Sequence, residues 1–325
     1  MAHPFTKGVH DLGNGAHAYL QPYGEWGYSN AGLITDGGEA LLVDTLFDER
    51  LTDEMMKALK DATGVGAGDV GTLVNTHANG DHTFGNRLIK NARIIASAAS
   101  THEMEEDGNP QRLAELLANW KSLGEVGVFF HKLFKDFDFA GVEFRLPDTT
   151  FSGEKTVKVG DKDVQLIELG PAHTAGDVII YSPKDRSVFT GDLLFIEGTP
   201  IAWAGPVSNW IKACDRIMAL DVESIVPGHG PITDKAGVKK MQSYLVFVEQ
   251  EAKKRHAAGM TAWEAAQDIA LGEFASWRDA ERIAVTVDTI FREINNDTSP
   301  RDIVALFGQM AELDKRFCAQ CGHAH

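Results

Sequence analysis

The stretch Thr76-His77-Ala78-Asn79-Gly80-Asp81-His82 gathers four side chains with metal-binding atoms into one short, glycine-containing turn. It directly follows the run from Gly71 to Asn75, which has the composition of a β-strand. Imidazole nitrogens and carboxylate oxygens are the ligands that divalent zinc, iron and manganese prefer in proteins. The stretch therefore predicts a metal site at the end of a strand.

Other polar side chains occupy the same kind of position elsewhere in the chain. Each comes shortly after an apolar, strand-like segment: Asp44 after 41–43, His173 after 164–169, Asp192 after 188–190 and His229 after 225–226. Backbone strands would deliver these side chains to one edge of a sheet. The sequence thus predicts one metal centre assembled from distant segments.

These motifs, taken in order, resemble those of the metallo-β-lactamase superfamily. The family pattern is a strand-end Asp, His-x-His-x-Asp-His, Gly-x-x-His, Gly-Asp and a final Gly-His, and the match covers about the first 235 residues. The resemblance implies an α/β (α+β) fold, a four-layer αββα sandwich. It would occupy residues 1–235 with a helical insertion at about 100–140, followed by a helical C-terminal extension over 236–325.

The resemblance also implies which residues contact metal. Carried over by position, the set is His77, Asn79 and His173 at a first position, Asp81, His82 and His229 at a second, and Asp192 bridging them. Asn79 departs from the pattern, because the family has a histidine there and an amide oxygen is a poorer zinc ligand. Three outcomes stay open: two metals with one held loosely, a single metal at the second position, or a site without catalysis. The six retained donors argue against the third.

The activity implied is that of a metal-dependent hydrolase. A hydroxide on zinc, with iron or manganese as alternatives, would attack the carbonyl of a small-molecule ester, lactone, thioester or amide. Asp81 is the expected catalytic residue, because it could orient the water and carry a proton to the leaving group. Asp44 is expected to hydrogen-bond the metal loop from beneath. The alternatives are an iron-dependent oxidoreductase resembling sulfur dioxygenases and a non-catalytic metal-binding member.

Composition narrows the partners. The 31 basic and 47 acidic residues give a net charge of −16, which disfavours nucleic-acid phosphates and anionic lipid surfaces as partners. The first residues lack the apolar core of a secretory signal, and no segment has the apolar length of a membrane span. Three cysteines make a disulfide framework improbable. We therefore expect a cytoplasmic protein with a small-molecule substrate.

The C-terminal third has a helical pattern only. Helices are expected over 235–256, 261–270, 280–295 and 299–317, with Thr261 and Ser299 as N-caps. They would either pack on the sandwich or form a homodimer interface. The final Cys318, Cys321, His323 and His325 have the spacing of half a zinc knuckle, but without a second cysteine pair a mobile tail is preferred.

Aromatic residues cluster in three segments. After an expected helix over 110–123, Phe129, Phe130, Phe134, Phe137 and Phe139 follow closely, either as packing for the insertion or as a lid over the metal. The loop 195–206 contains Phe195, Ile201, Trp203 and Pro206, and an earlier turn contains Tyr23, Trp26 and Tyr28. Both segments are candidates for lining a pocket for an apolar substrate, and ordinary packing explains them equally well.

Overall fold

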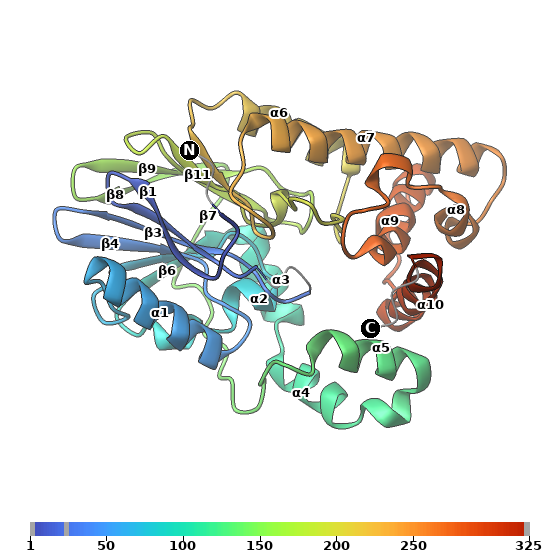
Figure 1. Cartoon of the computed structure of the whole chain (residues 1–325), viewed down its shortest axis with the longest axis horizontal. Coiled ribbons are helices and arrows are strands. Elements are labelled where there is room, and N and C mark those ends of the chain that lie inside the picture. Colours follow the sequence, from blue (N-terminus) through green and yellow to red (C-terminus); the bar gives the residue numbers. More distant parts are fainter. Residues whose placement is uncertain (1–3, 23–25, 322–325) are drawn as a thin grey trace.

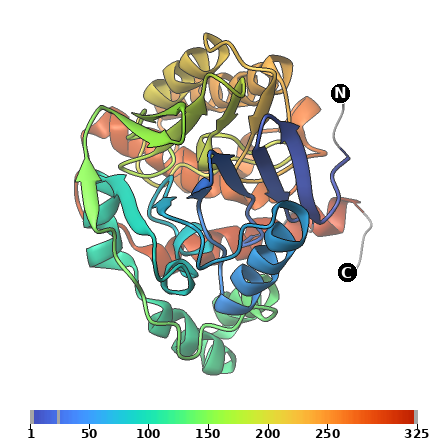
Figure 2. The same cartoon turned by 90° about the vertical axis from the view of Figure 1, so that its left-hand side faces the viewer.

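The computed structural model describes residues 4–22 and 26–321 (Figure 1). Two β-sheets pack face to face, and helices cover both outer surfaces. In the turned view, α6 (Val207–Met218) and α7 (Lys235–Ala257), in gold, lie above the sheets, and α1 (Glu49–Thr63), in blue, lies below them (Figure 2). The predicted four-layer αββα sandwich is confirmed.

The first sheet contains the strands of the N-terminal half. Its order along the sheet is β1 (Gly8–Gly13), β2 (Ala16–Leu20), β3 (Ala31–Asp36), β4 (Glu39–Val43), β5 (Thr72–Val74), β6 (Arg93–Ser97) and β7 (Thr149–Phe151). The first four strands pair antiparallel, as a meander, and β4 to β7 pair parallel. Parallel strands end at the same edge of a sheet, so the segments after β4 and β5 start side by side.

The second sheet contains the later strands. Its order is β12 (Ser224–Val226), β11 (Ser187–Phe189), β10 (Val178–Ser182), β9 (Lys162–Glu168) and β8 (Glu154–Val159). β11 and β12 run parallel, whereas the other pairs are antiparallel. β9 and β11 therefore point the same way, and both end at the edge where β12 ends.

Alternating side chains build two cores. Leu41 and Val43 of β4 belong to the cluster between the sheets, whereas Leu42 belongs to the cluster shared with the helices, as the two-residue period of a strand requires. Gly32 of β3 is part of this packing, because a Cβ there would lie 2.2 Å from a ring carbon of Phe189. The phenyl ring fills the space that the missing side chain leaves.

Ten α-helices are present in the described residues, some very short. Besides α1, α6 and α7, they are α2 (Gly80–Thr83), α3 (Ala98–Asp107), α4 (Pro110–Ala118), α5 (Gly124–Phe134), α8 (Ala262–Asp268), α9 (Ile283–Asn295) and α10 (Ile303–Cys321). The helix expected over 110–123 is shorter. Asn119 ends α4, where its side chain donates to the carbonyl of Glu115, and a 3₁₀ turn, Trp120–Leu123, follows.

The phenylalanines of the insertion are packing residues. All five of the predicted cluster are nearly inaccessible. Phe134 and Phe137 contact Phe47 at ring distances of 5.7 and 4.9 Å, and Phe130 contacts Phe307 of α10 at 6.2 Å. The cluster therefore joins the insertion to the first sheet's loops and to the C-terminal extension.

The C-terminal helices pack on their own chain. Thr289 of α9 donates its hydroxyl to the carbonyl of Ala202, and the backbone N–H of Val207 donates to Glu293. Of the two arrangements expected from the sequence, packing on the sandwich is therefore present, and a homodimer interface stays a prediction. Within the described residues, no helix is both long and apolar enough to cross a bilayer.

The predicted helix caps have different outcomes. Thr261 and Glu264 form the reciprocal hydrogen bonds of a capping box at the start of α8. The prediction for Ser299 was wrong, because its hydroxyl donates to Asp297 and α10 begins later, where Asp302 accepts from the N–H of Ala305.

The predicted zinc-knuckle residues Cys321, His323 and His325 lie outside the described side chains. The Cys318 thiol donates to Asp314.

A buried ion pair lies within the second sheet, and its lysine also contacts the first sheet. Lys162 of β9 and Asp185 are 1% and 0% exposed, and Nζ lies 2.7 Å from Oδ1. The same ammonium donates to the carbonyl of Asn14, in the turn between β1 and β2. Removing one partner of a buried pair strands the other charge away from water.

We predict that Lys162→Met lowers the free energy of unfolding by about 3–5 kcal/mol, because Asp185 loses its counter-charge. Urea denaturation followed by circular dichroism measures the change. Lys158→Met is the matched control, since Lys158 pairs with Asp163 while 66% exposed and should cost less than about 1 kcal/mol. Equal losses in the two variants would contradict the prediction.

Candidate metal centre

The predicted donors meet at one edge of the sandwich. His77 follows β5, His173 follows β9, Asp192 lies in a 3₁₀ turn (Gly191–Leu193) after β11, and His229 follows β12. Asp81 and His82 lie in α2 and Asn79 is its N-cap residue; this helix is at the same edge (Figure 1). Strand direction therefore places the segments together, as the sequence predicts.

Asp192 is at the centre of the cluster. The Nε2 atom of His82 lies 3.1 Å from its Oδ1, and the Nε2 atoms of His173, His229 and His77 lie 3.3, 3.3 and 3.8 Å from its Oδ2. Four imidazoles thus face one buried carboxylate.

The remaining two predicted residues border this cluster. Asp81 Oδ2 lies 3.2 Å from Nε2 of His229 and 3.8 Å from Nε2 of His82. The donor atoms of Asp81, His82 and His229 all lie within 4.8 Å of one another. Asn79 contacts the cluster through its amide nitrogen, 3.0 Å from Nε2 of His173.

Three buried atoms of the cluster make no well-aligned hydrogen bond within the described part of the chain, although two of them lie 3.1 Å apart. They are Nε2 of His77, Nε2 of His82 and Oδ1 of Asp192. Buried polar atoms in proteins nearly always have a partner, and imidazole nitrogens with a carboxylate oxygen form the donor set that zinc and iron accept. The residues therefore fit a divalent metal ion.

Asp44 orients two of the histidines. Its carboxylate accepts hydrogen bonds from the backbone N–H and the hydroxyl of Thr76, each at 2.7 Å, and from Nδ1 of His82 at 2.8 Å. Because the Thr76 hydroxyl donates to Asp44, it accepts from Nδ1 of His77 at 2.9 Å. Asp44 thus lies behind the histidines, and it leaves their Nε2 atoms facing the centre.

Backbone carbonyls orient the other two histidines. Nδ1 of His173 donates to the carbonyl of Ile201 at 2.6 Å, and Nδ1 of His229 donates to the carbonyl of Tyr28 at 3.1 Å. A carbonyl can only accept, so Nδ1 carries a proton in both rings, and Nε2 is the nitrogen that is left to bind a metal.

Two glycines allow this close approach. A Cβ at Gly191, which has φ of 49°, would lie 2.4 Å from the Thr76 hydroxyl oxygen. A Cβ at Gly228 would lie 2.0 Å from Oδ1 of Asp192. The Gly-Asp and Gly-His pairs in the sequence therefore have a steric cause.

Electrostatics keep the carboxylates ionised. Burial alone would raise the pKa of Asp81, but the neighbouring His82 and His229 outweigh it and lower the pKa to about 2. Burial likewise opposes ionisation of Asp192, yet His229, His82 and His77 hold its pKa well below the usual range. Both carboxyl groups are therefore in the anionic form that binds metal.

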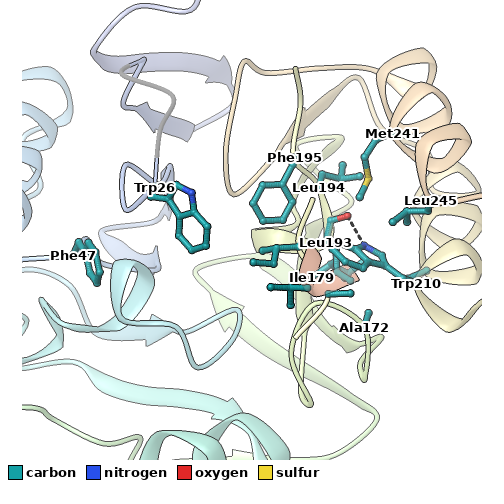
Figure 3. Close-up of a cluster of buried hydrophobic side chains, with 14 of the residues drawn as sticks. Trp26, Phe47, Ala172, Ile179, Leu193, Leu194, Phe195, Trp210, Met241 and Leu245 are labelled. Carbon is teal, nitrogen blue, oxygen red and sulfur yellow. Dashed lines mark hydrogen bonds between the residues drawn. The ribbon is translucent and has the colours of Figure 1, made fainter. Parts of the chain in front are cut away.

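Aromatic side chains support the centre from behind. Phe195 is buried and stacks on His229, with ring centroids 5.1 Å apart and planes 5° apart. Figure 3 shows Trp210 of α6, which donates its indole N–H to the carbonyl of Leu193 at 2.9 Å, beside Asp192. Phe195 was a candidate pocket residue, and this position makes it a support for the imidazoles.

The other candidate pocket residues lie in different surroundings. Trp203 is half-buried and its backbone N–H donates to the carbonyl of His173, whereas Ile201 is buried and Pro206 is exposed. Tyr28 is half-buried, and Tyr23 lies outside the described residues. Trp203 and Tyr28 therefore remain the aromatic candidates beside the predicted ligands.

One contact that supports the centre could not be predicted from the sequence. Trp26 donates its indole N–H to Glu281 at 3.0 Å, and the guanidinium of Arg282 lies 4.4 Å from its ring centroid. The C-terminal extension thereby anchors the turn whose Tyr28 carbonyl orients His229. No periodicity or motif links residues so far apart in the chain.

Known proteins share this architecture. The sequence model of the metallo-beta-lactamase superfamily matches residues 24–229. A Caenorhabditis elegans beta-lactamase-like protein 2 homolog is 27% identical over 218 residues, 67% of this chain and 60% of that protein. A hydroxyacylglutathione hydrolase of Methylococcus capsulatus is 24% identical over 160 residues, 48% of this chain and 46% of that protein. The chain thus spans less than two thirds of the length of these relatives.

Solved structures agree with the fold. A metallo-beta-lactamase from Pontibacter korlensis aligns with a TM-score of 0.55 at 19% identity, over 73% of this chain and 98% of its own. The sec-alkylsulfatase Pisa1 from Pseudomonas sp. aligns with a TM-score of 0.67 at 13% identity, over 98% of this chain and 55% of its own. Since the family model spans more than half of the sequence, this chain belongs to the metallo-beta-lactamase superfamily.

Proposed function

We propose that this protein is a metal-dependent hydrolase that cleaves a small-molecule ester, lactone, thioester or amide, with zinc as the first choice of metal. The observation that carries the proposal is the convergence of four imidazole Nε2 atoms on the buried, ionised Asp192. The hydrolase named among its relatives supports the same class of reaction.

Different residues of the cluster would bind the metal and transfer the proton. His82, Asp192 and His229, with Asp81, would hold the ion, which when bound acidifies a water molecule and polarises a carbonyl group. Asp81 is the more accessible of the two central carboxylates, with 12% of its side chain exposed against 3% for Asp192. Asp81 would therefore orient the water, accept its proton and pass that proton to the leaving group.

The surroundings of the centre favour a substrate with apolar bulk. Trp203 follows the Ile201 carbonyl that orients His173, and its ring stacks on Phe307 of α10 at 6.5 Å. Tyr28 packs on Phe137 at 4.8 Å. Half-buried aromatic rings next to a polar centre are typical of small-molecule sites.

The metal requirement is testable directly. We predict that a chelator abolishes hydrolysis across a panel of p-nitrophenyl esters, lactones and thioesters, and that added zinc restores it. His82→Ala should lower kcat/KM at least about 100-fold, because it removes a ligand and its orienting contact. Tight metal binding without turnover would instead indicate a binding protein. Bound iron with oxygen consumption would indicate an oxidoreductase.

His102→Ala is the matched control for that experiment. His102 is 69% exposed on α3 and pairs only with Glu106 among the described salt bridges. Its replacement should leave both metal content and kcat/KM unchanged. A comparable loss in the two histidine variants would mean that His82 acts through stability and not through the metal.

We predict that Asp44→Asn lowers metal affinity about 10–100-fold, because an amide cannot accept all three hydrogen bonds that hold Thr76 and His82. Competition with a chromogenic zinc chelator measures the affinity. Asp48→Asn is the control, since Asp48 is also a buried aspartate but caps α1, a role that asparagine also fulfils. Unchanged affinity in Asp44→Asn would contradict the orienting role.

Trp203→Ala tests the apolar pocket. We expect a higher KM for esters with a long acyl chain, by about tenfold from the lost apolar contact, and little change for acetyl esters. Steady-state kinetics with a series of acyl lengths measures the difference. The same KM at every length would remove Trp203 from the pocket.

A further inference from the structure

Asn79 makes a contact that changes the first of the two metal positions. Its amide nitrogen lies 3.0 Å from Nε2 of His173, and Nδ1 of His173 donates to the carbonyl of Ile201. With its proton on Nδ1, His173 has one lone pair left, on Nε2, and Asn79 donates to it. A single lone pair cannot accept that hydrogen bond and bind a metal at once.

The first position is therefore short of ligands. Without His173 it keeps Nε2 of His77 and Oδ2 of Asp192, which are 3.8 Å apart. The donor atom of His82 also lies within 4.8 Å of those of His77 and Asp192. His82 can bind only one ion through Nε2, however, and that atom belongs equally to the second position, which has more donors. Zinc in proteins takes at least three protein ligands, and a neutral amide oxygen from a rotated Asn79 is a poor third.

The second position has a full set. Asp81, His82 and His229 bring their donor atoms within 4.8 Å of one another, and Asp192 adds Oδ1 at 3.1 Å from His82. Each of its two histidines is oriented through Nδ1, by Asp44 and by the Tyr28 carbonyl. A catalytic zinc takes three protein ligands and keeps one position for water, so the donors here exceed the minimum that the proposed function requires.

We infer that the protein holds a single metal ion, at the position of Asp81, His82, Asp192 and His229, and that the hydrogen-bonded pair of Asn79 and His173 replaces the other metal. Asn79 is the residue that sets this number. The inference rests on the metal centre of the proposed function, and it concerns how many ions the centre holds.

Metal counting tests the inference. Metal-free protein is loaded with excess zinc, dialysed, and measured by inductively coupled plasma mass spectrometry. Wild type should retain one zinc per chain. Asn79→His should retain two, because it adds an imidazole beside the unpartnered Nε2 of His77 and releases His173. Asn79→Gln, which keeps the amide, is the matched control and should retain one.

Two results would overturn the inference: two retained ions in wild type, or one ion in an Asn79→His variant with an unchanged melting temperature. If that variant fails to fold, metal-free wild type is titrated with cobalt instead. The visible absorption of the bound cobalt should saturate at one equivalent. Saturation at two equivalents would overturn the inference. If wild type binds two ions and hydrolyses a substrate, the inference about the number of ions is wrong but the proposed function holds. If wild type binds one ion and hydrolyses no substrate, the inference holds but the proposed function is wrong.

Discussion

The structure depends on a buried carboxylate, that of Asp192, which four imidazoles face at the edge of two sheets. An ionised group removed from water is costly unless charge and hydrogen bonds compensate it. Within the described residues, Oδ1 of Asp192 and two of the facing Nε2 atoms make no well-aligned hydrogen bond. A divalent cation at the position of Asp81, His82, Asp192 and His229 would give Nε2 of His82 and the Asp192 carboxylate a partner, so the cost of burying this charge and the proposed chemistry have the same physical origin.

The rest of the chain holds that cluster in place. Gly191 and Gly228 let the backbone approach Thr76 and Asp192, and Trp210 fixes the turn that carries Asp192. The C-terminal extension also supports the cluster. Its Glu281 accepts a hydrogen bond from Trp26, and the carbonyl of Tyr28, two residues later, orients His229. The helical extension is thus part of the centre's support as well as of the outer layer.

The sequence predicted helices and their ends correctly where the interactions that decide them lie within a few residues. The helix expected at 261–270 is present as α8, because the capping box of Thr261 and Glu264 that starts it is encoded within a few residues. The predicted start of α10 was wrong, because serine and aspartate are both good N-cap residues. The choice between Ser299 and Asp302 depends on neighbours such as Asp297. The sequence left two roles open for the aromatic run near Phe134, packing or a lid. The contact between Phe134 and Phe47, which is distant in the chain, identifies it as packing.

By itself, the sequence determined the α/β sandwich and named the side chains that meet at its edge, because strand-end donors follow from local pattern and order. It also exposed Asn79 as a departure. Only the tertiary structure decided what Asn79 contacts, because its partner His173 follows a strand of the other sheet. The same holds for the central place of Asp192 and for the Trp26–Glu281 contact, since distances between residues far apart in the chain are set by packing.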